Sequence, residues 1–166
     1  MQRAIGIALL VLALGSTATA AVPEHFLHGT KCVTDSRYGG IQYGPQYGPY
    51  NNASSGGRQL LWCSLDLQDV STLDYVYSLT VNVTDRNENS GQDVTCSVWT
   101  MNADGSGGMV SVLSTSSWSQ SVLGLAFGNF YLTYGTFVDV QCYLPIYSGN
   151  HGYSNLVSID LQYPGL

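Results

Sequence analysis

A two-residue hydrophobic period runs through most of the chain and restricts what it can fold into. In "DYVYSLTVNVT" (74–84), Tyr77, Leu79, Val81 and Val83 fall on one face and polar side chains on the other, as in a strand with one buried face. The stretches "DVTCSVWTM" (93–101), "FVDVQCYL" (137–144) and "LVSIDLQY" (156–163) repeat the pattern. No segment after residue 20 has the spacing of an amphipathic helix. The sequence therefore predicts an all-β protein.

Weaker alternation at 59–65, 109–113 and 122–127 indicates further strands, and a short one near Cys32 is compatible with the pattern. The Asp-Gly signal within "NADGSGG" (102–108) predicts a hairpin loop. Such short strands between turn signals predict an antiparallel β-sandwich of about seven or eight strands, jelly-roll or immunoglobulin-like. Val140 occupies the place of the tyrosine that precedes the second core cysteine of immunoglobulin domains, so that family is not assigned.

The first residues have the layout of a secretory signal peptide. Arg3 precedes an apolar run from Ala4 to Leu14, and Ala18-Thr19-Ala20 forms a small-residue cleavage site. We expect residues 1–20 to be removed and residues 21–166 to form one domain outside the cytoplasm, either secreted or periplasmic. The apolar run is shorter than the roughly 20 residues that a membrane helix needs.

Four cysteines follow the predicted leader, namely Cys32, Cys63, Cys96 and Cys142. An even number in an oxidising compartment predicts disulfides, and the absence of any C-x-x-C pair argues against a zinc site. Cys96 and Cys142 share the inward phase of two well-formed strands, so we expect them to be bonded. Cys63 then pairs with Cys32 by elimination.

The charge balance excludes some partner classes. Without Arg3, four basic residues stand against eleven acidic ones, a net charge of −7. Nucleic-acid binding needs a basic patch to neutralise phosphates, and anionic membranes favour basic segments. The sequence therefore predicts no nucleic-acid partner, no membrane span and no cofactor. It leaves the oligomeric state open.

The stretches "VTCSVWTMNADGSG" (94–107) and "YGTFVDVQCYLP" (134–145) resemble small exported bacterial β-sandwich proteins of unassigned function. In these proteins strands end in V-x-C and x-C-x-L-P. The resemblance covers the C-terminal half of the chain. It implies the sandwich fold and no particular activity.

The segment "TDRNENSGQDVTC" (84–96) places oxygen-bearing side chains at alternate positions, as a calcium loop does. Its candidate ligands are Asp85, Asn87, Asn89 and Asp93. An EF-hand loop has glycine at its sixth position and a bidentate glutamate at its twelfth, where this chain has Ser90 and Cys96. The alternative is a strand-to-strand turn, in which Asn, Asp, Ser and Gly are favoured. We favour the turn, so no metal site is predicted.

Residues 37–57 contain the tandem "QYGPQYGP" and the candidate ligand-binding residues Tyr43, Tyr47 and Tyr50. This segment is either an adhesive or sugar-stacking loop or a long surface loop laid over the sandwich edge. We favour the surface loop.

Register adds a second aromatic site. If Cys96 lies opposite Cys142, then Trp99 lies opposite Asp139 on the outer side of the sheet. Met101 lies opposite Phe137 on the same side. This outer face is either an open platform for a ligand or covered by the Tyr-rich segment, and we favour the covered arrangement.

No catalytic motif is present: G-x-S-x-G, H-E-x-x-H and a Gly-rich phosphate loop are all absent. His25 and His28 have no helix that would aim them at one metal. Asn52 and Asn82 begin N-glycosylation sequons, which matter only in a eukaryotic secretory route. The sequence favours a non-catalytic binding module for a glycan or surface protein. A self-assembling structural subunit is the alternative, and a small secreted hydrolase ranks third.

Overall fold

The structure is a computed structural model of the whole chain. It describes residues 24–29, 32–34, 41–44, 48–52, 57–65, 75–88, 91–102, 104–116, 118–119, 121–132, 137–147 and 152–163. The predicted leader lies outside these ranges. The strands within them are β1 (Glu24–His28), β2 (Val33–Thr34), β3 (Ile41–Gly44), β4 (Gly48–Asn51), β5 (Gln59–Leu65), β6 (Tyr75–Thr84), β7 (Thr95–Met101), β8 (Gly107–Ser114), β9 (Leu123–Tyr131), β10 (Phe137–Leu144) and β11 (Asn155–Gln162).

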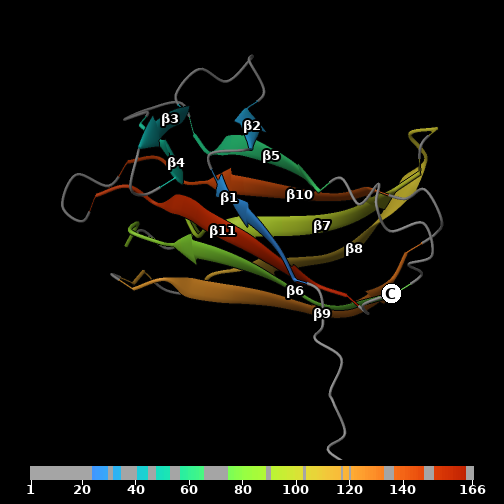
Figure 1. The fold of residues 1–166 in the computed structure, drawn as a ribbon. Coiled ribbons are helices and arrows are strands. Elements are labelled where there is room, and N and C mark those ends of the chain that lie inside the picture. Colours follow the sequence, from blue (N-terminus) through green and yellow to red (C-terminus); the bar gives the residue numbers. More distant parts are fainter. Residues whose placement is uncertain are drawn as a thin grey trace, which may run out of the picture.

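Two antiparallel sheets face each other and form a sandwich (Figure 1). Sheet A has the order β3-β4-β11-β6-β9, with β1 paired to β11, and sheet B has the order β2-β5-β10-β7-β8. The eight strands from β4 to β11 are divided between the sheets as 4-11-6-9 and 5-10-7-8, which is the strand order of a jelly roll. The predicted sandwich is confirmed, and the topology is the jelly roll rather than the immunoglobulin alternative.

The three remaining strands, β1 to β3, are short additions to the two sheets. They bring the described strands to eleven, more than the sequence predicts. A strand of two to five residues offers too few side chains for its period to be recognised. The short strand that the sequence allows near Cys32 is β2, and all the other predicted strands are among the eight of the jelly roll.

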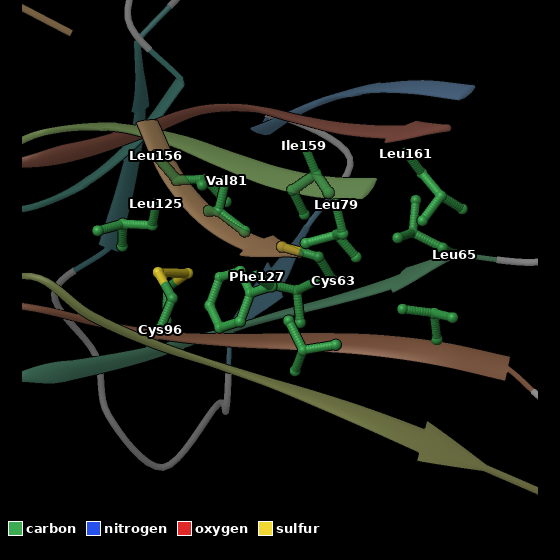
Figure 2. Close-up of a cluster of buried hydrophobic side chains, with 14 of the residues drawn as sticks. Cys63, Leu65, Leu79, Val81, Cys96, Leu125, Phe127, Leu156, Ile159 and Leu161 are labelled. Atoms are coloured by element: carbon green, nitrogen blue, oxygen red, sulfur yellow. A yellow bond between two sulfur atoms is a disulfide. The ribbon is translucent and has the colours of Figure 1, made fainter. Parts of the chain in front are cut away.

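Side chains from both sheets fill the space between them (Figure 2). Leu79 and Val81 point inward from β6 and Ile159 from β11, towards Cys63 on β5 and Cys96 on β7. All of these side chains are buried. A core of this kind, built from alternate residues of both sheets, explains why the two-residue period dominates the sequence.

Both predicted disulfides are present. Cys96 and Cys142 are opposite each other on β7 and β10 and are bonded, and Cys32 before β2 is bonded to Cys63 on β5. The first bond therefore joins neighbouring strands within sheet B. The predicted register is also confirmed, because Trp99 pairs with Asp139 and Met101 with Phe137.

Two predicted side-chain orientations are wrong because bulges interrupt the alternation. Tyr77 is predicted to face the core, but the β6–β9 register shifts between Val76 and Leu79. Val76 is therefore buried and Tyr77 is exposed. On β11 the alternation predicts Val157 in the core with Ile159 and Leu161. A shift between Leu156 and Ser158 instead leaves Leu156 in the core and Val157 only half-buried. A bulge adds one residue to a strand, so the side chains before it point to the opposite faces from those that regular alternation predicts.

The Tyr-rich segment is not simply a loop. Residues 41–44 and 48–51 pair as the antiparallel hairpin β3–β4, which extends the edge of sheet A beside β11. Gly48 has φ of 72°, and a Cβ there would lie 2.1 Å from the carbonyl oxygen of Leu156. Glycine is therefore required where β4 meets β11. The described part of this segment belongs to sheet A, whereas Trp99 lies on sheet B, so these described residues do not form the predicted lid over Trp99.

No helix among the described residues has the length and apolar character that a bilayer span requires.

Replacing Cys96 and Cys142 together by alanine should lower the free energy of unfolding by about 4 kcal/mol, since the bond closes a long loop in the unfolded chain. The two residues are 46 positions apart. Urea denaturation of the purified protein measures this loss. Equal stability of the variant and the parent would contradict the contribution assigned to this bond.

Candidate functional site

The outer side of sheet B carries the residues that alternate with its buried core positions. On β5, β7 and β10 the inward residues Cys63, Cys96 and Cys142 are buried. The residues between them point away from the core. We call this surface the outer aromatic face, and its members are Leu60, Trp62, Ser64, Thr95, Ser97, Trp99, Met101, Phe137, Asp139, Gln141 and Tyr143, with Val33, Met109 and Val112 at its two edges.

Two aromatic side chains of this face are open to solvent. Trp62 on β5 is 37% exposed and Tyr143 on β10 is 40% exposed. Trp62 pairs with Gln141 and Tyr143 pairs with Leu60. Exposed aromatic side chains that gather in one patch are typical of interaction surfaces.

Trp99 lies flatter against the sheet. Its indole Nε1 donates a hydrogen bond of 3.0 Å to Oγ of Ser97, two residues back on the same strand. Ser97 is an outward residue, yet it is only 8% exposed. This burial follows from an indole ring that lies along β7. The side chain of Trp99 is half-buried. It is therefore neither fully covered by another segment nor fully open to solvent.

Asp139 lies directly across from Trp99 and is held in place. Oγ of Ser64 donates a hydrogen bond to its Oδ1, and the residue is 7% exposed. The carboxylate is therefore part of the floor of the face rather than a side chain that projects from it.

Polar groups without protein partners lie among these rings. Within the described residues, no hydrogen bond satisfies the indole N–H of Trp62, the hydroxyl of Tyr143 or the side-chain amide of Gln141. They offer donors and acceptors to a ligand. The sequence did not identify these three residues as site candidates.

Arg58 borders the same face just before β5. Its Nη2 donates to the carbonyl oxygen of Asp93 and, at 2.9 Å, to Oγ1 of Thr95. The guanidinium therefore ties the start of β5 to the start of β7 across β10. Its Nε is buried and has no hydrogen-bond partner.

The predicted tyrosines lie elsewhere. Tyr43 on β3 donates its hydroxyl to the carbonyl oxygen of Cys32 at 2.8 Å, and burial raises the pKa of its phenol. Tyr50 on β4 packs against Tyr153, with ring centroids 4.5 Å apart. Tyr47 lies outside the described residues. The sequence offered these tyrosines and Trp99 as candidate ligand-binding residues, and the structure places Tyr43 and Tyr50 on sheet A but Trp99 on sheet B.

The calcium-like segment is organised around Asp85, which is fully buried. Its Oδ1 accepts hydrogen bonds from the backbone N–H of Asn87 and from Oγ of Ser154, at 3.1 and 3.2 Å. Its Oδ2 accepts from the backbone N–H of Val94 at 3.1 Å and from Oγ1 of Thr115. Four protein donors thus surround this one carboxylate.

The other residues of the segment also have structural partners. Nδ2 of Asn87 donates to the carbonyl oxygen of Ile146 at 3.0 Å, and the carbonyl oxygen of Asp93 accepts from Arg58. Asn89 lies outside the described residues. These contacts support the turn interpretation, because a carboxylate that already accepts four hydrogen bonds has no lone pair directed at a cation.

Of the two N-glycosylation sequons, the one at Asn82 has side-chain contacts in the structure. Its Nδ2 donates to Oγ of Ser158 at 3.0 Å and to Oδ2 of Asp160 at 2.7 Å. In the folded protein this amide is therefore engaged, whereas Asn52 is exposed. His25 and His28 lie on β1. No group of three or more His, Cys, Asp or Glu suited to a metal occurs in the described ranges.

Comparisons with known proteins identify the fold. No protein-family model matches the chain, and no curated protein matches its sequence. Among solved structures, a xylan-binding module CBM15 is 12% identical and superposes with a TM-score of 0.53, covering 86% of this chain and 97% of its own. At this identity the likeness shows a shared β-sandwich fold.

Two further structures superpose less well. The CBM22-1 xylan-binding domain of Paenibacillus barcinonensis Xyn10C has a TM-score of 0.47 at 14% identity, covering 90% of this chain and 100% of its own. The Podospora anserina GH26-CBM35 β-(1,4)-mannanase has a TM-score of 0.46 at 15% identity over 86% of this chain. This chain spans only 28% of that enzyme.

Replacing Asp85 by alanine should lower the free energy of unfolding by about 3 kcal/mol or more, because buried donors lose their acceptor. Thermal and urea unfolding measure the loss. The parent protein should keep its melting temperature in millimolar calcium, since its carboxylate is already satisfied. A clear rise with calcium that disappears in Asp85→Ala would show that the segment is a metal site after all.

Proposed function

We propose that the chain is an exported, non-catalytic glycan-binding module and that the glycan lies on the outer aromatic face. The observation that carries this proposal is the combination of exposed rings with unpaired polar groups on one sheet surface. Trp62 and Tyr143 supply the exposed rings, and Gln141, which lies on β10 opposite Trp62, supplies an unpaired amide.

The chemistry of a sugar matches such a surface. A pyranose ring presents C–H groups on its faces and hydroxyls around its rim. An aromatic face packs against the C–H groups, while nearby amide, hydroxyl and indole groups bond to the rim. Trp62 and Tyr143 can each make both kinds of contact. The ring packs against the sugar, and the free indole N–H or hydroxyl forms a hydrogen bond with it.

The comparisons support the proposal at the level of the fold. The CBM15 module, which shares the sandwich, is by its name a xylan-binding module. A fold alone does not assign a function, because unrelated functions occur on the same sandwich. The residues of the outer aromatic face therefore carry the argument for this chain.

A non-catalytic role follows from the carboxylates. Most glycoside hydrolases act through a pair of carboxyl groups that flank the scissile bond. Among the described members of the outer aromatic face, Asp139 is the one carboxylate, and it is bonded to Ser64. Two disulfides are typical of a protein outside the cytoplasm, which accords with the predicted signal peptide.

Self-assembly remains a second candidate because of an uncharged stretch. From Gly105 to Val138 there are 34 consecutive residues without Asp, Glu, Lys, Arg or His. This stretch includes β8 and β9, which are edge strands of the two sheets and lie close to each other. Edge strands usually carry charges or proline that prevent pairing with another chain. Two copies of an acidic protein would meet here with the least repulsion.

Glycan binding should fail when the rings are removed. The double variant Trp62→Ala and Trp99→Ala should lose detectable binding on a glycan array, since each stacking contact contributes about 1 kcal/mol. Trp62→Ala alone should change the melting temperature little, because that ring is exposed.

Trp118 provides the matched control. It is the third tryptophan of the chain, it is 40% exposed, and it lies in the connection from β8 to β9 outside the outer aromatic face. Trp118→Ala should bind as the parent does. Undiminished binding by the double variant would contradict the proposed site.

If the uncharged edges mediate self-assembly, sedimentation velocity should show oligomers that grow with concentration. Ala126→Lys places a charge on the exposed edge strand β9 and should shift the protein towards monomer. Ala126→Ser is the control and should behave as the parent does. A parent that stays monomeric at every concentration would rule out this second candidate.

A further inference from the structure

Three rings of the outer aromatic face, those of Tyr143, Trp62 and Trp99, are spread along one strand direction. The register places Tyr143 level with Thr95, Trp62 level with Gln141, and Trp99 level with Asp139. Each of these levels is two residues from the next along β10. At about 3.4 Å per residue, the Cα positions of Tyr143 and Trp99 are roughly 14 Å apart along the strand. The indole of Trp99 reaches back from its own level towards Ser97, which is level with Gln141.

Across the strands the same rings are confined to a narrow band. Tyr143 lies on β10 itself, while Trp62 and Trp99 lie on its two neighbours, β5 and β7. Neighbouring strands are about 4.8 Å apart. The backbone of each of these three residues therefore lies on β10 or within one strand spacing of it. The rings therefore follow the direction of β10, from the level of Tyr143 past that of Trp62. A ligand that touches all three rings spans more than one sugar along this strand.

Gln141 lies at the centre of this band. It pairs with Trp62 on one side and with Ser97 on the other, and Ser97 lies under the indole of Trp99. Its half-buried amide has both a donor and an acceptor, and neither is used within the described part of the chain. An amide in this position can read the hydroxyl groups in the middle of a bound chain.

The charges around the band favour an uncharged ligand. Asp139 contributes a carboxylate to the floor of the face, and the whole chain carries a formal net charge of −6. The nearby guanidinium of Arg58 already donates to Asp93 and Thr95. Uronate or sulfate groups would meet repulsion that a neutral sugar does not.

Resting on the proposed function, we infer that the ligand is a neutral, extended oligosaccharide that lies along β10. Its sugars stack on Tyr143, Trp62 and Trp99. The amide of Gln141 bonds to its middle and acts as the specificity-determining group.

Calorimetric titration with linear β-1,4-linked xylo-, manno- and gluco-oligosaccharides, from the monosaccharide to the hexasaccharide, tests the length requirement. Affinity for the preferred series should rise roughly tenfold for each further ring that is stacked, and then level off. Trp99→Ala should remove the gain at the long end and keep the affinity for the shorter members. Polygalacturonate, the acidic probe, should bind more weakly than the neutral chains.

Gln141→Leu tests the central contact, since it keeps most of the side-chain volume and removes the amide. It should weaken binding by roughly tenfold and leave the melting temperature unchanged. The matched control is Gln162→Leu, because Gln162 is exposed on β11 of sheet A. It should bind as the parent does.

The outcomes separate this inference from the proposed function. Affinity that is independent of chain length, insensitivity to Gln141→Leu, or a preference for polygalacturonate would overturn the inference and leave glycan binding in place. Failure of the parent protein to bind any of these glycans, neutral or acidic, would overturn both.

Discussion

The pairing of β7 with β10 determines what the rest of sheet B presents to solvent. Cys96 lies opposite Cys142 and is bonded to it, so the two strands cannot slide past each other. A slip of one residue would exchange the core residues with the outer ones. With the register fixed, Trp99, Gln141 and Tyr143 all face outward. The bond thus stabilises the sandwich and orients the candidate site.

Sequence and structure agree where the alternation is regular. The strands β7 and β10 have clear inward and outward phases, and both disulfides and the Trp99–Asp139 pair follow from them. The sequence "QLLWCSL" of β5 is different, because Leu60 and Trp62 are apolar and yet point outward. The period is least clear where exposed aromatic residues form a surface, since such residues break the binary pattern. Trp62 could therefore not be recognised from the sequence alone.

Other differences have local causes. The bulges near Tyr77 and Val157 depend on how two strands fit together, which a single strand's sequence does not encode. The hairpin β3–β4 depends on contacts with Leu156 from the far end of the chain. The surroundings of Asp85 also depend on residues that are remote in sequence. Alternating oxygens resemble a calcium loop, but hydrogen bonds from Thr115 and Ser154, both remote in sequence, occupy its carboxylate.

The central claim is that the outer aromatic face of sheet B binds a glycan, and the three tryptophan indoles report on it directly. In a ¹⁵N-correlated NMR spectrum, adding the preferred neutral oligosaccharide should shift the indole N–H signals of Trp62 and Trp99. The signal of Trp118, which lies outside this face, should stay in place. A shift of Trp118 alone, or of none of the three at saturating ligand, would contradict the account.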